Sequence, residues 1–318
     1  MRTGPASDTT GYFHQAAFYG SDEEFLAVVV PFLTDGVSAG EPTLVTLGEA
    51  NNRLVRSALA DTDGISFVPA EMQYARPAAS IRLYQAMMAE YTERGAAQIR
   101  IVGDVPHPGL GAEWGWWARY EAAVNDAYAA YPVWGLCPYD VRSTPEDVLA
   151  DVARTHPHLA TVDGAHVTNP DFVDPAGFLA GLMNTAPPPE LEPPAMVLTD
   201  PTSQAARKAV QSVAAQRLSR VPDIAVQDMV FAVSEGVENA ILYGCGPTTL
   251  RIWSYRDRLV AHVTDTGSGP ANPYTGLVRA ETSATAGVGL WLAHQMCADV
   301  TLHRHPDGFT LRIAVDAN

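Results

Sequence analysis

The sequence predicts an α/β protein of two domains, a doubly wound domain with a mainly parallel sheet followed by an α/β two-layer sandwich. Apolar strand-like runs alternate with helical patterns over the first half of the 318 residues. A proline-rich segment then interrupts the chain at residues 186–194. Beyond it, the pattern changes to two helices, a strand pair, a further helix and a terminal strand pair.

The proline-rich segment sets the expected domain boundaries. Each proline removes a backbone donor and restricts the residue before it, so neither a helix nor a central strand is expected there. We predict a first domain over residues 1–185, a stiff linker over residues 186–196 and a second domain over residues 197–318.

The elements of the first domain follow from local patterns. Ser21 is a candidate cap for a helix with apolar residues at helical spacing over residues 25–33. Further helices are expected at residues 52–59, 79–94 and 116–131, and strands at residues 43–47, 65–68, 99–102 and 133–137. Strands separated by helices imply right-handed crossovers and a parallel sheet.

Ligands of such sheets bind at the carboxyl ends of the strands. Polar residues follow three predicted strands, at residues 48–49, 103–107 and 137–140, and three tryptophans near residue 115 could line an aromatic pocket there. A packed core with polar loop ends explains the same pattern equally well. His14, His107, Cys137 and His158 could serve as metal or haem ligands, but their separations match no standard ligand spacing, so no metal site is predicted in this domain.

Composition and charge exclude several classes of protein. The formal net charge of −16, with the acidic excess almost wholly before residue 195, argues against direct binding to nucleic acid. No apolar run approaches the roughly 18 residues that cross a bilayer, and the first ten residues lack the apolar core of a signal peptide. We therefore expect a cytoplasmic protein. The three cysteines, Cys137, Cys245 and Cys297, form no disulfide framework.

Several short motifs over residues 12–165 resemble the MEDS sensory domain of methanogens and methylotrophs. The residues that carry this resemblance are His14, Tyr19, Gly40-Glu41-Pro42, Tyr120-Glu121, Asn125, Leu136-Cys137-Pro138-Tyr139-Asp140 and His156-Pro157. The resemblance implies a sensory role with a small-molecule ligand that the family leaves open.

The second domain begins with two predicted helices, at residues 203–218 and 224–242. Apolar residues recur at three- and four-residue steps along the second helix, from Val226 to Ile241, and predict one buried stripe. Strands are expected at residues 249–255, 259–263, 300–304 and 309–315.

Polar and glycine residues form an ordered series in this domain. Glu235 and Asn239 are four residues apart and project from one helix face, which by itself is typical of a solvated surface. The series continues with Asp265-x-Gly267-x-Gly269 after a strand, Gly287-x-Gly289-Leu290 at a helix start, and Gly308-x-Thr310 between strands. Each motif alone is weak, but the ordered series is specific.

Over residues 197–316 this series resembles the GHKL (Bergerat) ATPase superfamily, and within it the bacterial anti-sigma factor serine/threonine kinases. The resemblance implies ATP and magnesium as cofactors. It places Glu235 as the general base, Asn239 as the magnesium ligand and Asp265 as the acceptor of the adenine amino proton. The remaining implied contacts are Gly267 and Gly269 at the base, Gly287, Gly289 and Leu290 at the phosphates, and Thr310 supporting adenine.

Two features depart from the family pattern. Tyr243 stands where many relatives have histidine. Residues 270–286 would form the lid over the phosphates, and Arg279 is their only basic residue.

Two activities remain open. Histidine autophosphorylation is improbable, because His156 precedes a proline and the proline-rich segment occupies the place of a dimerising hairpin. The resemblance implies a kinase that phosphorylates a serine or threonine of an anti-anti-sigma (STAS-type) partner, with a sigma factor competing for the same domain and homodimer formation in keeping with the family. The alternative is a nucleotide-gated protein-binding module without kinase activity. In either case, the first domain would control the second.

Overall fold

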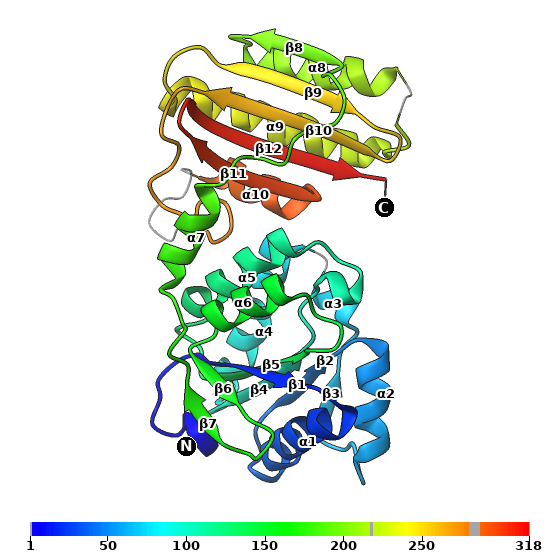
Figure 1. Cartoon of the computed structure of the whole chain (residues 1–318), viewed down its shortest axis with the longest axis vertical. Helices are drawn as coiled ribbons and strands as arrows, with labels where there is room; N and C mark the ends of the chain where they lie inside the picture. Colours follow the sequence, from blue (N-terminus) through cyan, green and yellow to red (C-terminus); the bar gives the residue numbers. More distant parts are fainter. Residues whose placement is uncertain (1, 75, 217–218, 280–286, 318) are drawn as a thin grey trace. The chain divides into compact units, whose positions relative to one another are not determined.

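The computed structural model describes residues 2–74, 76–216, 219–279 and 287–317. The chain divides into two compact units, Met1–Phe178 and Leu179–Asn318 (Figure 1). The proline-rich segment therefore lies within the second unit. Among the described residues, no helix is both long and apolar enough to cross a membrane.

The first unit contains a seven-stranded sheet with the strand order β3-β2-β4-β5-β1-β6-β7. The pairs from β3 to β6 are parallel, and only β7 is antiparallel to its neighbour. The strands are β1 (Phe13–Tyr19), β2 (Thr43–Thr46), β3 (Ile65–Phe67), β4 (Ile99–Gly103), β5 (Val133–Asp140), β6 (His158–Ala160) and β7 (His166–Thr168). The predicted mainly parallel sheet is confirmed.

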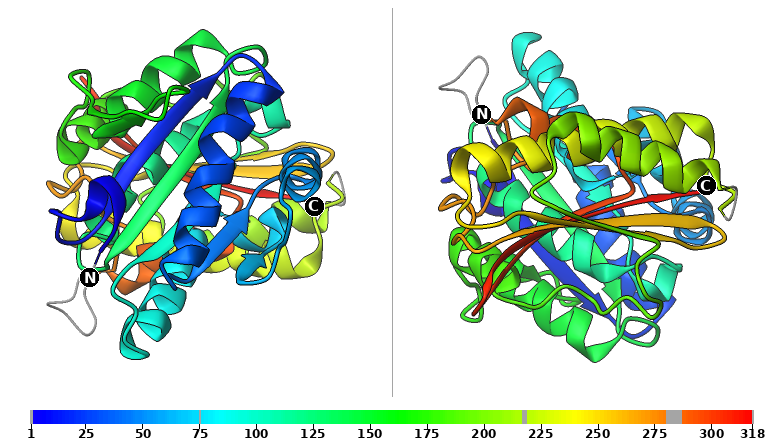
Figure 2. Two further views of the ribbon diagram at one scale, coloured as in Figure 1. Left: turned by 90° about the horizontal axis from the view of Figure 1, so that it is seen from below. Right: turned by 90° about the horizontal axis from the view of Figure 1, so that it is seen from above.

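Helices cover both faces of this sheet, as right-handed crossovers require. The helices α1 and α2 lie together on one face, and α4, α5 and α6 lie on the other (Figures 1 and 2). Ser21 caps α1, since its hydroxyl accepts the Glu24 N–H at 3.2 Å. The helices are α1 (Asp22–Ser38), α2 (Glu49–Ala58), α3 (Ala70–Gln73), α4 (Pro77–Glu93), α5 (Trp114–Ala127), α6 (Glu146–Thr155) and α7 (Pro175–Met183).

The strand β1 was not predicted, although it lies between β5 and β6 inside the sheet. Nearly all of its residues are buried on both faces, so the alternation of apolar and polar residues that marks a half-buried strand is missing. His14 and Gln15 also interrupt its apolar run. The helix α6 was likewise missed.

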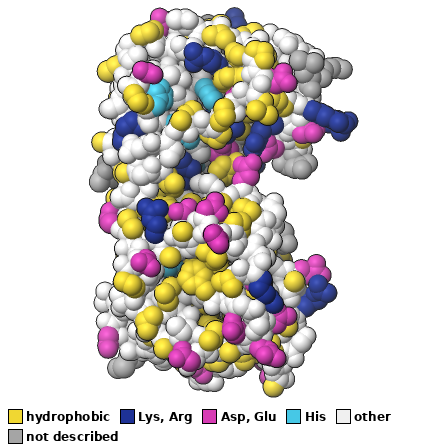
Figure 3. All heavy atoms as spheres, viewed as in Figure 1, with side chains coloured by type: hydrophobic (Ala, Val, Ile, Leu, Met, Phe, Trp, Pro, Cys, Tyr) yellow, Lys and Arg dark blue, Asp and Glu magenta, His cyan; other side chains and the backbone are white. Residues whose placement is uncertain are grey.

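Acidic side chains are spread over the surface of the first unit, and basic side chains are few on the face drawn in Figure 3. This distribution agrees with the acidic excess before residue 195.

The second unit is a two-layer α/β sandwich, as predicted. Its five strands are antiparallel, in the order β11-β12-β10-β9-β8. The helices α8, α9 and α10 pack on one face of the sheet (Figures 1 and 2). The elements are β8 (Met196–Thr199), α8 (Ser203–Ala215), α9 (Asp223–Tyr243), β9 (Thr249–Ser254), β10 (Arg258–Asp265), α10 (Val288–Met296), β11 (Asp299–His305) and β12 (Gly308–Asp316).

The helix α9 packs closely on β10 and β12. A Cβ at Gly236 would stand 2.7 Å from the Leu311 side chain, so this glycine allows the close approach of helix and sheet. The predicted apolar stripe is buried from Val226 to Val237. Ile241 was wrongly included, because it is 55% exposed near the end of the helix.

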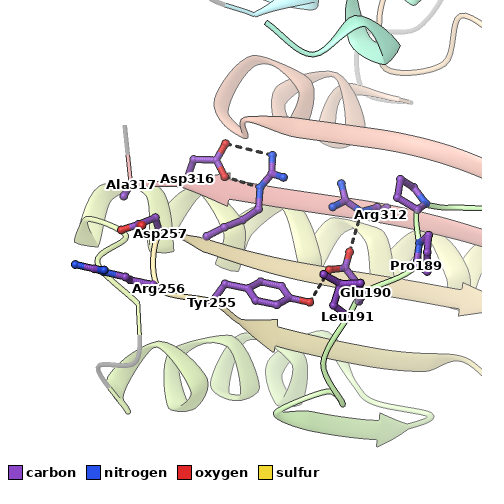
Figure 4. A pocket seen from close by; sticks show the side chains of 11 residues that line it. Pro189, Glu190, Leu191, Tyr255, Arg256, Asp257, Arg312, Asp316 and Ala317 are labelled. Atoms are coloured by element: carbon purple, nitrogen blue, oxygen red, sulfur yellow. Dashed lines mark hydrogen bonds and ion pairs between the residues drawn. The ribbon is translucent and has the colours of Figure 1, made fainter. Parts of the chain in front are cut away.

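The proline-rich segment contacts the other face of this sheet (Figure 4). Glu190 accepts hydrogen bonds from the Tyr255 hydroxyl at 2.8 Å and from the Arg312 guanidinium at 3.2 Å. The Trp253 indole N–H donates to the Glu192 carbonyl at 2.8 Å. The segment is thus held to β9 and β12 by side chains that the sequence analysis did not single out.

Candidate functional site

A cavity of about 470 Å³ lies in the second unit between α9, α10 and the sheet. We call it the second-unit cavity. Five of the predicted site residues line it, namely Asn239, Asp265, Gly269, Gly287 and Leu290. The structure thus brings together residues from a helix, a strand end, a loop and a helix start that are up to 51 positions apart in the sequence.

Apolar side chains form much of the cavity wall. They come mainly from the inner face of the sheet and are Val263, Leu302, Phe309 and Leu311. The sequence analysis did not name them as site residues. The alternation of inward-facing residues along the predicted strand at 309–315 is the signal that could have identified Phe309 and Leu311.

Asp265 is the last residue of β10 and is 6% exposed. Its Oδ1 accepts the backbone N–H groups of Gly267 at 2.6 Å and Cys245 at 3.2 Å. These two bonds hold the carboxylate at the cavity wall. A Cβ at Gly267 would stand 2.7 Å from the same oxygen, so glycine allows this tight turn.

Two further glycines have backbone angles that side chains rarely adopt. Gly269 has φ +67°, and a Cβ there would stand 2.2 Å from the Phe309 ring. Gly287 has φ +80° at the N-cap of α10, with open space around the position of a Cβ. The first backbone N–H groups of α10 have no partner within the helix and are potential donors to an anion.

Glu235 and Asn239 project from adjacent turns of α9, as predicted, and both are half-buried. Asn239 reaches the cavity. Glu235 does not line it, because its carboxylate lies against the start of α10. A Cβ at Gly289 would stand 1.9 Å from Glu235 Oε2, so glycine is required there for this arrangement.

Thr310 also lies outside the cavity lining. Its hydroxyl is 2.9 Å from the Thr264 hydroxyl and 3.1 Å from His305 Nε2. Of the predicted lid, residues 270–279 are described and residues 280–286 lie outside the described residues. Arg279 stacks over the Trp291 ring with its Cζ 5.8 Å from the ring centroid.

The residues present fit a nucleotide with its magnesium ion. Cavities of about 300–1,000 Å³ with apolar walls and a few fixed polar groups are typical of small-molecule sites. The apolar wall suits a purine ring, and the start of α10 suits phosphate oxygens. Magnesium usually has one or two protein ligands besides phosphate and water, so the single Asn239 amide oxygen suffices.

In the first unit, the structure groups side chains differently from the expectation. The three tryptophans do not line the aromatic cavity, which is instead surrounded by the tyrosines 12, 74, 84, 120 and 128. His14 Nε2 lies 3.5 Å from Cys137 Sγ. The other two residues considered as ligands lie elsewhere. His107 accepts the Gly109 N–H at the end of β4, and His158 stacks on Phe13.

The chain contains a doubly wound α/β unit and a two-layer α/β sandwich with this cavity. Residues 13–157 match the family described as MEDS, the MEthanogen/methylotroph, DcmR Sensory domain. Residues 198–315 match the histidine kinase-like ATPase domain family. The chain is therefore a MEDS domain fused to a histidine kinase-like ATPase domain.

Two further comparisons were made. No curated protein matches the chain. Among solved structures, the chain is similar to the NMR structure of the histidine kinase domain of the E. coli osmosensor EnvZ, with 19% sequence identity and a TM-score of 0.24. That match covers 41% of this chain and 93% of the other.

Proposed function

We propose that the second unit binds Mg-ATP and phosphorylates a serine or threonine of an anti-anti-sigma (STAS-type) partner. The supporting observation is the convergence of Asp265, Asn239 and the glycine-led start of α10 around one apolar cavity. A carboxylate, a side-chain amide and the first backbone N–H groups of α10 therefore lie around a cavity that can hold one ligand.

Each of these groups makes a different contact with the nucleotide in this proposal. Asp265, fixed by its two backbone bonds, accepts the amino proton of the purine. The apolar wall excludes water from the ring. The N–H groups at the start of α10 donate to phosphate oxygens, and Asn239 offers its amide oxygen to magnesium. Magnesium, when bound, neutralises phosphate charge.

Glu235 is the proposed acceptor of the proton from the partner's hydroxyl group. Positioning of the two reactants supplies most of the rate enhancement in phosphoryl transfer, and a general base adds about 10²- to 10⁴-fold. Glu235 lies against the start of α10, where the phosphate groups are proposed to bind.

The kinase proposal is tested with the purified full-length chain, γ-labelled ATP and a candidate STAS-type partner. We expect label on a serine or threonine of the partner. ATP binding by calorimetry without any transfer of label would contradict kinase activity and leave binding intact. No binding of ATP or ADP at millimolar concentration would contradict the whole proposal.

One observation favours the alternative, a nucleotide-gated protein-binding module. Glu235 lies against Gly289 and does not line the second-unit cavity, so the proposed general base does not face that cavity. Capture of the partner that depends on ATP, with no phosphate transfer, would select this function over the kinase.

We further propose that the first unit binds a small molecule and alters nucleotide binding by the second unit. The protein would act in the cytoplasm, with a sigma factor competing with the partner for the second unit and with homodimer formation as in the family. Such control requires a ligand with different affinity for two states of the protein. Its measure is the ATP affinity of the full chain with and without candidate ligands. An unchanged affinity and unchanged partner capture would contradict it.

A further inference from the structure

Four side chains from four elements of the first unit meet at one point beneath α5 and α6. We call them the buried cluster, and they are His14 of β1, Glu121 of α5, Cys137 of β5 and His156 at the end of α6. One potential ligand atom from each lies within 4.8 Å of all the others. None of the four side chains is more than 8% exposed.

The two histidines present the same nitrogen to the centre of the buried cluster. The Asn125 side-chain amide donates to the Thr155 carbonyl at 2.9 Å, so its oxygen is free to accept from His14 Nδ1 at 3.1 Å. His156 Nδ1 donates to the Val152 carbonyl at 2.8 Å. Both rings are therefore oriented with their Nε2 lone pairs toward the cluster. Histidine ligands of metal ions are commonly oriented in this way by a hydrogen bond from the other ring nitrogen.

The two hydrogen bonds assign the proton of each ring to Nδ1. A neutral imidazole with Nδ1 protonated has an Nε2 lone pair that can bind a cation.

Two polar atoms of the buried cluster lack a hydrogen-bond partner. They are Glu121 Oε2 and His156 Nε2, and both side chains are fully buried. The other oxygen of Glu121 accepts the Tyr139 hydroxyl. An unsatisfied buried polar atom costs about 1–3 kcal/mol, so two of them side by side require a compensating interaction.

Three of the six distances between these ligand atoms match those of a tetrahedral metal site. Bonds of 2.0–2.3 Å to a metal place neighbouring ligand atoms about 3.3–3.8 Å apart. Glu121 Oε2 lies 3.4 Å from His14 Nε2 and 3.6 Å from His156 Nε2. His14 Nε2 lies 3.5 Å from Cys137 Sγ.

We propose that the buried cluster binds one divalent transition-metal ion of the zinc or iron(II) class through His14 Nε2, His156 Nε2, Glu121 Oε2 and Cys137 Sγ. The mixture of imidazole, carboxylate and sulfur excludes magnesium and calcium, which take oxygen ligands. Binding displaces the thiol proton of Cys137, which is released to solvent. A cavity of about 30 Å³ borders three of these residues, which leaves room for one water-sized molecule beside the ion.

The test uses the full-length chain without a histidine tag. It is stripped with a chelator and titrated with Co²⁺ and then Zn²⁺. We expect one Co²⁺ per chain, the absorption bands of a tetrahedral site with a thiolate-to-cobalt transition, and loss of these bands when Zn²⁺ is added. Cys137→Ser removes the thiolate band, whereas Cys245→Ser, which alters an exposed cysteine of the second unit, keeps it.

Folding of each variant is checked by circular dichroism. If Cys137→Ser does not fold, X-ray absorption at the zinc edge of the wild-type protein decides the matter. One sulfur and three nitrogen or oxygen neighbours at about 2.0–2.3 Å support the site. Less than one bound metal ion per chain, or a zinc-edge spectrum without a sulfur neighbour, would overturn the proposal. The buried cluster would then be a hydrogen-bonded network of protonated side chains.

Discussion

The buried cluster and the second-unit cavity differ in the space that their polar groups surround. They also differ in where the residues that carry these groups lie in the sequence. The cluster gathers four buried ligand atoms that all lie within 4.8 Å of one another. The cavity has a volume of about 470 Å³ and only a few polar groups on an apolar wall. The first arrangement suits a single small cation, and the second suits an organic molecule with an anionic end.

The difference also explains what sequence reasoning can detect. The cavity residues lie in short motifs with fixed spacing, because one helix, one turn and one helix start each supply several of them. The cluster takes one residue from each of four elements between positions 14 and 156, so no local spacing reveals it. Contacts of that kind exist only once the sheet has formed.

The largest expected effect concerns Glu235. Glu235→Gln keeps the shape of the side chain and removes the proton acceptor, so transfer of phosphate to the partner should fall about 10²- to 10⁴-fold while ATP affinity changes little. The matched control is Glu238→Gln, since Glu238 lies on the exposed side of the same helix and accepts the Ser203 hydroxyl. Equal transfer rates in the two variants would remove Glu235 from catalysis.

The carboxylate of Asp265 should matter for binding itself. Asp265→Asn replaces a carboxylate acceptor by an amide, and loss of a buried hydrogen-bond partner costs about 1–3 kcal/mol, so ATP affinity should fall about 10- to 100-fold. Calorimetry with ATP and ADP measures the change. Asp257→Asn, in the hollow on the other face of the sheet, serves as the control. If both variants bind as the wild type does, the purine does not contact Asp265.

In the first unit, Asn125 should act as a positioning residue for the proposed metal. Asn125→Ala removes the acceptor of His14 Nδ1, and loss of such a partner typically lowers metal affinity about 10- to 100-fold. Asn125→Asp, which keeps an acceptor, should retain more of the Co²⁺ affinity. The control is Asn52→Ala. The side-chain amide of Asn52 donates to the Leu47 carbonyl, away from the cluster. Equal Co²⁺ affinities in the alanine and aspartate variants would contradict the orienting role.

The sequence predicted most elements of both units but not the strand that carries His14. The reason is burial on both faces of β1, which removes the period that reveals a half-buried strand. The glycines of the cavity were found from their spacing, but the contact between Gly289 and Glu235 was not, because it joins two elements 54 residues apart. Ile241 was wrongly assigned to the buried stripe, since its side chain is exposed near the end of α9.

The smallest expected effect is a pH dependence of stability that involves Asp104. Asp104 follows β4, and Asp265 lies at the end of β10, so both are buried aspartates at strand ends. Both accept a backbone N–H, and Asp104 Oδ2 takes the Gly48 N–H at 2.9 Å and the Asn51 amide at 3.0 Å. Burial nevertheless raises the pKa of Asp104 to about 6. Burial also raises the pKa of the neighbouring Tyr19 to about 12, so Tyr19 does not titrate at the same pH as Asp104.

The sign of the pH dependence follows from this shift. The folded chain holds a proton on Asp104 that the unfolded chain releases near pH 4, so the contribution of Asp104 to the free energy of unfolding should decrease as the pH rises from about 4 to 6, by at most about 1.4 kcal/mol per pH unit. Asp104→Asn should remove this contribution and so change the pH slope of the wild type, and Asp61→Asn, in an exposed loop, should not. Urea denaturation between pH 4 and 7, followed by hydrogen exchange of the β2 and β4 amides, measures the slope. An equal slope in Asp104→Asn and wild type would show that the carboxylate is already ionised in the folded protein, so that its two hydrogen bonds outweigh its burial.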